Sequence, residues 1–285
     1  MAANDFPLSV RDLKKIYPSF RLDGVSFDLQ PGAVTGFIGR NGAGKTTTLN
    51  SLLGFIRPDG GKALFWGMEM RDRADEIKRR IGFVSAGMTY YMRKKLKTIT
   101  AVTRSFYPGW DENTYQKYMR RFGLAEEKTP AALSNGMKIK YALALALSRG
   151  AELLILDEPT SGLDPVSREE LTEIFLSLRD AGKTILFSTH ITADLEKCAD
   201  RILYIRAGKL SADCAMDEFS DAYRIAEFEG EAPKEIRAAT LGLCRTRKGG
   251  TVLVRKEDAA GINASWQTPT LDEIMTHLDR EEAEE

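Results

Sequence analysis

Short apolar stretches separated by turn residues open the chain. Val25–Leu29 and Ala33–Ile38 lie on either side of Pro31-Gly32, which predicts a strand, a turn and a second strand. A helix is expected to begin near Lys45, because three leucines spaced as on one helical face follow it and lead up to Gly54. This part of the chain therefore predicts two strands followed by a loop and a helix.

The pattern becomes helical over residues 86–150. Tyr115, Tyr118 and Met119 mark one helical face, with Asp111 as the expected N-cap and Gly123 as the expected stop. We expect this stretch to form a helical subdomain.

Strand and helix patterns alternate again after residue 150. Leu153–Leu156 and Ile185–Phe187 are apolar at every position, as expected for parallel strands buried on both faces. Between them, Val166–Arg179 has helical periodicity, and Ser167 with Glu170 resembles a capping box at its start. The overall pattern predicts an α/β core into which the helical subdomain is inserted.

The last part of the chain, residues 216–285, has its own pattern. Tyr223–Phe228 and Thr251–Val254 look like strands, and Leu271–Leu278 has the spacing of a closing helix. Residues 219–285 hold nine basic and 14 acidic side chains, whereas the whole chain has a net charge of zero. We expect an accessory domain here, and no motif in it points to chemistry.

Composition limits the possible classes of protein. The 285 residues suggest about two domains at ~150 residues each, and 43% hydrophobic with 29% charged residues exclude a disordered chain. A protein that binds nucleic acid mainly by neutralising phosphates would have an excess of basic residues, so the zero net charge argues against that partner.

Targeting and membrane signals are missing from the sequence pattern. The longest apolar run, Tyr141–Leu147, has seven residues, whereas a spanning helix needs ~20. Met1–Pro7 does not resemble a secretory signal, so we expect the chain to stay in the cytosol. Cys198, Cys214 and Cys244 are widely spaced and there are two histidines, which argues against a zinc site.

The strongest chemical motif follows the second predicted strand. It matches the pattern G-x-x-x-x-G-K-[ST], whose glycines let backbone N–H groups surround phosphate oxygens at a helix N-terminus. The lysine of this pattern reaches the β- and γ-phosphates, and its threonine hydroxyl binds Mg²⁺. The motif comprises Gly39, Arg40, Asn41, Gly42, Ala43, Gly44, Lys45 and Thr46, with Thr47 next to it. It predicts a nucleotide-binding site.

An acidic pair ends the predicted strand Leu153–Leu156. Asp157 would hold Mg²⁺, and Glu158 would orient or deprotonate the attacking water. Adjacent strand residues point to opposite faces, so the two carboxylates have different roles. Alone, such a pair is more often a cap or loop feature; after a phosphate loop it predicts a Walker B site.

Further motifs follow in a recognisable order. Leu133–Met137 precedes the acidic pair, Ser161–Asp164 comes shortly after it, and His190 ends the next predicted strand. From about Leu8 to Leu210 the chain resembles the ATPase subunit of an ATP-binding-cassette (ABC) transporter, most closely the bacterial antimicrobial-peptide and drug exporters. The resemblance implies a P-loop NTPase (RecA-like) α/β core with an antiparallel β subdomain and a helical insertion. It places the ATPase domain at 1–215, with the helical subdomain at about 86–150 and a small α+β extension at 216–285.

The resemblance also implies roles for individual residues. Tyr17 would stack on adenine, although an ordinary packed tyrosine is the alternative. Ser134, Asn135 and Gly136 would bind the γ-phosphate of the nucleotide held by the other protomer, although a serine before a helix is also a common N-cap. His190 would contact the γ-phosphate.

Three further positions bear on contacts with other subunits. The family places Asp164 at the dimer contact, although Asp164-Pro165 is also a good helix start. Two residues depart from the family pattern: Ala86 stands where a glutamine is usual, and Asn135 replaces the first glycine of the signature. Alanine can neither bind Mg²⁺ nor hold the attacking water, so either a water molecule fills the gap or the coupling from nucleotide to membrane partner runs differently.

The resemblance implies the function of a transport motor. Two copies, or one copy and a related chain, would close head to tail on two ATP·Mg²⁺ and drive a separate transmembrane permease subunit from the inner face of the membrane. That subunit would dock near Met88–Lys97, where Tyr90, Tyr91 and Met92 form either an exposed patch or buried packing. The alternatives are an ABC ATPase of translation or DNA repair, a weakly hydrolysing ATP-binding module, and a small-molecule kinase.

Overall fold

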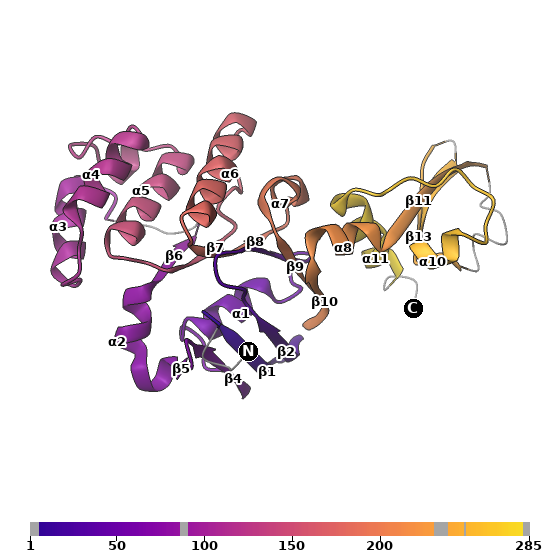
Figure 1. The fold of residues 1–285 in the computed structure, drawn as a ribbon, viewed down its shortest axis with the longest axis horizontal. Helices are drawn as coiled ribbons and strands as arrows, with labels where there is room; N and C mark the ends of the chain where they lie inside the picture. The colour runs from indigo at the N-terminus through magenta and orange to yellow at the C-terminus, as the bar shows by residue number, and fades with distance from the viewer. Residues whose placement is uncertain (1–5, 86–90, 231–238, 248, 282–285) are drawn as a thin grey trace.

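The computed structural model describes residues 6–85, 91–230, 239–247 and 249–281, arranged in three sheets (Figure 1). Four strands form an antiparallel sheet in the order β2-β1-β4-β5. Their bounds are Ser9–Tyr17 for β1, Phe20–Asp28 for β2, Gly60–Phe65 for β4 and Met68–Glu69 for β5. The predicted antiparallel β subdomain is thus present.

The central sheet has six strands in the order β10-β9-β3-β8-β7-β6. The strands from β9 to β6 pair in parallel, and β10 pairs antiparallel with β9. Their bounds are Val34–Ile38 for β3, Ile81–Ser85 for β6, Leu153–Asp157 for β7, Thr184–Thr189 for β8, Arg201–Arg206 for β9 and Lys209–Ala215 for β10. The two strands predicted around Pro31-Gly32 both exist, but β2 and β3 belong to different sheets.

Helices line both faces of the central sheet, and its strands are apolar on both faces for that reason. In β7, Leu153 and Ile155 share a buried cluster with α1 and the antiparallel sheet, whereas Leu154 and Leu156 share another with α5 and α6. This alternation follows the two-residue period of a strand. The helices around the sheet are α1 (Lys45–Leu52), α2 (Met70–Arg80), α6 (Pro165–Asp180) and α7 (Thr192–Cys198).

The helical insertion lies at one end of the molecule in Figure 1. It contains α3 (Leu96–Ser105), α4 (Glu112–Arg121), the 3₁₀ turn η1 (Pro130–Ala132) and α5 (Asn135–Ser148). Asp111 caps α4 as predicted, since its carboxylate accepts the Asn113 N–H at 2.9 Å. Gly123 follows α4 with a φ of 62°, the left-handed conformation expected of a stop.

The elements after residue 215 lie at the opposite end in Figure 1, coloured orange to yellow. Among the described residues, they are the three strands of the sheet β11-β13-β12 and the helices α8, α10 and α11. Their bounds are Met216–Asp221 for α8, Tyr223–Glu229 for β11, Gly242–Arg245 for β12, Gly249–Arg255 for β13, Lys256–Ala259 for α10 and Leu271–Glu281 for α11. Strand β12 was not predicted, because only four residues form it.

The helix start at Asp164-Pro165 is confirmed, and the capping box of Ser167 with Glu170 is wrong. Helix α6 begins at Pro165, and its N-cap is Asp164, which accepts the Ser167 N–H at 3.0 Å. Ser167 therefore lies inside the helix, and Glu170 forms an ion pair with Lys140 rather than a capping box. Proline fits the first helical position because it has no N–H to satisfy there, so the start moves to the residue before it.

A buried hydroxyl joins the helices of the insertion. Thr100 of α3 lies 2.9 Å from the Tyr115 hydroxyl of α4 and 2.8 Å from the Tyr141 hydroxyl of α5. The Tyr141 hydroxyl also donates to the Leu96 carbonyl at 3.0 Å. All three hydroxyl-bearing residues are buried.

We expect Thr100→Val to lower the free energy of unfolding by about 1–3 kcal/mol, because the shape is kept while two buried phenols lose a partner. Thr98→Val is the matched control, since Thr98 lies exposed on the same helix. Chemical denaturation followed by fluorescence measures both. Equal midpoints for the two variants would show that the shared hydroxyl contributes nothing.

Candidate functional site

The phosphate loop, residues 39–46, links the central strand β3 to helix α1. A Cβ on Gly39 would lie 2.3 Å from the Ile205 carbonyl oxygen of β9, so only glycine allows the loop to pack this close to the sheet. Gly44 has a φ of 115°, and a Cβ there would lie 2.9 Å from the Phe20 ring. The predicted strand, loop and helix are all present, with backbone N–H groups at the start of α1.

Lys45 is buried beneath this loop, with a relative exposure of 6%. Its ammonium donates to the Gly39 carbonyl at 2.6 Å and to the Arg40 carbonyl at 3.3 Å, and it lies 3.7 Å from Oε1 of Glu158. Burial lowers the pKa of Lys45, although the carboxylates of Glu158 and Asp157 oppose this shift. A phosphate bound in the loop would place a negative charge close to the buried ammonium.

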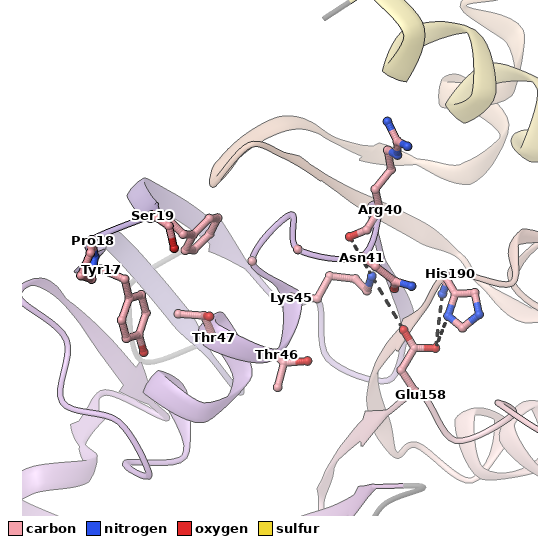
Figure 2. A pocket seen from close by; sticks show the side chains of 13 residues that line it. Tyr17, Pro18, Ser19, Arg40, Asn41, Lys45, Thr46, Thr47, Glu158 and His190 are labelled. Atoms are coloured by element: carbon pink, nitrogen blue, oxygen red, sulfur yellow. Dashed lines mark hydrogen bonds and ion pairs between the residues drawn. The ribbon is translucent and has the colours of Figure 1, made fainter. Parts of the chain in front are cut away.

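Glu158 lies beyond the end of β7 in the left-handed backbone region, with a φ of 51°. Its N–H donates to the Ser188 carbonyl of β8 at 3.0 Å, which holds the residue in this turn. Its carboxylate accepts a hydrogen bond from Nδ1 of His190 at 2.8 Å. The lysine, glutamate and histidine predicted from separate motifs are thus in one chain of contacts (Figure 2).

The two carboxylates of the acidic pair have different partners. Asp157 is the last residue of β7, and its Oδ1 accepts the Ser188 hydroxyl at 2.6 Å. Thr46 is exposed at the start of α1. A hydroxyl and a carboxylate are oxygen donors of the kind that Mg²⁺ prefers, so these residues fit the predicted metal.

A cavity of about 640 Å³ lies over the phosphate loop. Tyr17, at the end of β1, lines it on the side away from Glu158 and His190 (Figure 2). The other lining residues are Pro18, Ser19, Phe20, Arg40, Asn41, Gly42, Gly44, Lys45, Thr46, Thr47, Glu158 and His190. An aromatic side chain at one end and phosphate-binding groups at the other suit a nucleotide.

The signature residues lie outside this cavity lining. Ser134 is the N-cap of α5, and its hydroxyl accepts the Met137 N–H at 3.2 Å, so the capping role considered from sequence is present. Asn135 accepts a hydrogen bond from Lys138 at 3.4 Å, and Gly136 packs beside Ser167 of α6. The structure thus brings the phosphate loop, acidic pair and histidine together, but not the signature.

The structure describes only some of the residues on which two predictions for the insertion depend. Ala86 and Tyr90 lie outside the described residues. Tyr91 is exposed by 76% and Met92 by 38%, so the described part of the predicted docking patch is not buried packing. No helix in the described ranges is both long and apolar enough to cross a bilayer.

Sequence reasoning missed several residues of the site. Ser188 positions both members of the acidic pair, but a serine inside an apolar strand has no distinguishing pattern. Pro18, Ser19 and Phe20 also line the cavity, and their position directly after Tyr17 was the available signal.

Comparisons with known proteins agree with this geometry. A family model described as ABC transporter matches residues 22–161. The bacitracin transport ATP-binding protein BcrA of Bacillus licheniformis is 34% identical over 221 residues, which cover 76% of this chain and 72% of that protein. Nod factor export ATP-binding protein I of Burkholderia thailandensis is 32% identical over 272 residues, which cover 90% and 88%.

A solved structure described as the ATP binding subunit of an ABC transporter has a TM-score of 0.67 at 29% identity, covering 74% of this chain and 90% of that one. The P-loop NTPase fold expected from the motifs is confirmed. With a family match that spans its phosphate loop and acidic pair, and relatives that align over most of both chains, the chain belongs to the ATP-binding proteins of ABC transporters, which are ATPases that drive transport.

Proposed function

We propose that this chain binds ATP·Mg²⁺ in the 640 Å³ cavity and hydrolyses it in a head-to-tail dimer that drives an exporter. The observation that carries the proposal is the contact between three predicted residues: Lys45 lies 3.7 Å from Glu158, which lies 2.8 Å from His190. A buried cation, a carboxylate and an imidazole together can hold a phosphate and a water molecule.

The nucleotide is held from both ends of the cavity. Tyr17, with a relative exposure of 36%, presents its ring to the adenine, and the Lys15 ammonium lies 5.7 Å from the centroid of that ring. The N–H groups of residues 39–47 surround the phosphates, and Lys45 pairs with them in place of Glu158.

Thr46 and Asp157 would hold Mg²⁺. The ion, when bound, neutralises charge on the phosphates. The Ser188 hydroxyl fixes one carboxylate oxygen of Asp157 at 2.6 Å, which orients the side chain before the ligand arrives.

Glu158 accepts the proton of the attacking water. Its release from Lys45, once phosphate pairs with the ammonium, frees a carboxylate oxygen for this role. The Nδ1 proton of His190 is donated to the other oxygen, so the imidazole orients the carboxylate. His190 would also contact the γ-phosphate once the nucleotide is bound.

The second protomer supplies the signature. Ser134, Asn135 and Gly136 form the start of α5, a 14-residue helix whose N–H groups and positive dipole end suit an anion. These residues lie outside the cavity lining of their own chain, which supports a role in the site of another chain. Asp164, which caps α6 beside Gly136, would support the same contact.

A transmembrane permease would dock on the insertion. Tyr91, Val102 and Phe106 are exposed by 76%, 53% and 72%, an unusual number of exposed large apolar side chains for so short a stretch. Docking there would hold residues 1–215 against the inner face of the membrane, with 216–285 as an accessory domain. The name of the bacitracin relative supports transport, and the name of the Nod factor relative supports export.

Lys45→Ala is expected to abolish ATP binding measured by calorimetry, because the buried cation that pairs with the phosphates is removed. Lys62→Ala is the control, since Lys62 is an exposed lysine on β4. Wild-type affinity in Lys45→Ala would refute the assignment of the phosphate loop.

Glu158→Gln is expected to accumulate an ATP-bound dimer, visible by light scattering, because the amide cannot accept the proton and hydrolysis no longer reopens the dimer. The double variant Lys45→Ala/Glu158→Gln should remain monomeric. A single variant that stays monomeric in saturating ATP·Mg²⁺ would contradict the head-to-tail arrangement.

A further inference from the structure

The side chain of Arg40 leaves the nucleotide cavity for the C-terminal segment, defined here as residues 216–285. Figure 2 shows it pointing away from Lys45 and Glu158. Its Nε lies 3.8 Å from Oδ2 of Asp279 in helix α11. The backbone of the same residue faces inward, since its carbonyl accepts the Lys45 ammonium at 3.3 Å. Arg40 therefore connects the C-terminal segment to the base of the phosphate loop.

Asp279 is held in place by groups of the central sheet. Its side chain is exposed by 10%, Oδ1 accepts the Tyr204 hydroxyl at 2.9 Å, and the same oxygen lies 3.6 Å from Nε of Arg206. Burial and the neighbouring carboxylate both raise the pKa of Tyr204, so the phenol keeps its proton and donates. Arg206 also donates to the Leu278 carbonyl at 2.5 Å, which fixes the end of α11 against β9.

Other residues of α11 also pack against the core. Its apolar residues Leu271, Ile274 and Leu278 are buried in the same cluster as Leu195 of α7, and the Leu271 N–H donates to Glu196 at 2.5 Å. The position of Asp279 is therefore set by how α11 packs on the core. Movement of that segment would move the carboxylate.

The outer face of the phosphate loop is not tightly packed. A second cavity of about 240 Å³ lies between the loop residues 40–43, the end of β9 and Asp279. Arg40 itself is exposed by 68%, so it has room to turn when its partner is removed. Loss of the Asp279 carboxylate would remove the negative charge that lies next to the Arg40 guanidinium.

We propose that Asp279 is a positioning residue through which the C-terminal segment lowers the nucleotide affinity of the phosphate loop. The carboxylate holds Arg40 away from the loop and neutralises part of its charge, so incoming phosphates meet a less positive site. Displacement of α11 would free the guanidinium and strengthen binding. This inference rests on the proposed function, because it takes residues 39–46 as the phosphate site.

Asp279→Asn tests the link, since the amide oxygen can still accept from Tyr204 while the charge is lost. We expect the dissociation constant for ADP, measured by calorimetry on the full chain, to fall about two- to five-fold, because the Arg40 side of the ion pair is exposed to solvent. The difference should shrink at high salt, because exposed charges are screened. A change in fold stability alone would lack this salt dependence.

Two further variants, Arg40→Met and Tyr204→Phe, separate an effect of the Asp279 charge from an effect of loosened packing of α11. In Arg40→Met, adding Asp279→Asn should leave the dissociation constant unchanged; an equal fall in both backgrounds would overturn the proposal. Tyr204→Phe removes a hydrogen bond to the same carboxylate but keeps its charge, and it should bind ADP as the wild type does. If it binds as tightly as Asp279→Asn, loosening of α11 explains the effect and the proposal fails.

Lys45→Ala, measured in parallel, distinguishes a failure of the link to Asp279 from a failure of the proposed phosphate site. If it loses ADP binding while Asp279→Asn binds as the wild type, only the link to the C-terminal segment is wrong. If it binds normally, the phosphate assignment itself has failed.

Discussion

The need to keep a charged ammonium stable in a buried place governs this site. Lys45 is almost inaccessible to solvent, and its partners are two loop carbonyls and one carboxylate at 3.7 Å. Carbonyl dipoles and a distant carboxylate compensate a buried charge only in part. The loop must wrap closely for them to reach it, which requires glycine at residue 39. In the proposed function, this ammonium exchanges Glu158 for phosphate.

Much of the fold and site could be predicted because the signals are local. The phosphate loop is a continuous motif between a strand and a helix, and Asp157 and Glu158 end a strand that is apolar throughout. The prediction of His190 depended on its neighbours, since a lone histidine has no pattern of its own. It follows a second apolar strand, which is parallel to the first, and this brings it to the same edge of the sheet. Tyr17 came from family resemblance alone.

What could not be predicted depends on contacts between distant parts of the chain. Asp279 is an ordinary residue in an acidic region, and only folding places it beside Arg40, 239 positions earlier in the sequence. Ser188 similarly gains its role from the strand next to it. The capping box at Ser167 failed for a different reason, because two good caps compete within four residues and the proline decides between them.

The left-handed backbone at Glu158 has a consequence for the evolution of the chain. A non-glycine residue in this conformation costs on the order of 1 kcal/mol, which a glycine at the same position would relieve. A glycine there would relieve the backbone but remove the carboxylate to which the proposed function assigns the proton of the attacking water. Stability and the proposed catalysis therefore make opposite demands on this one residue.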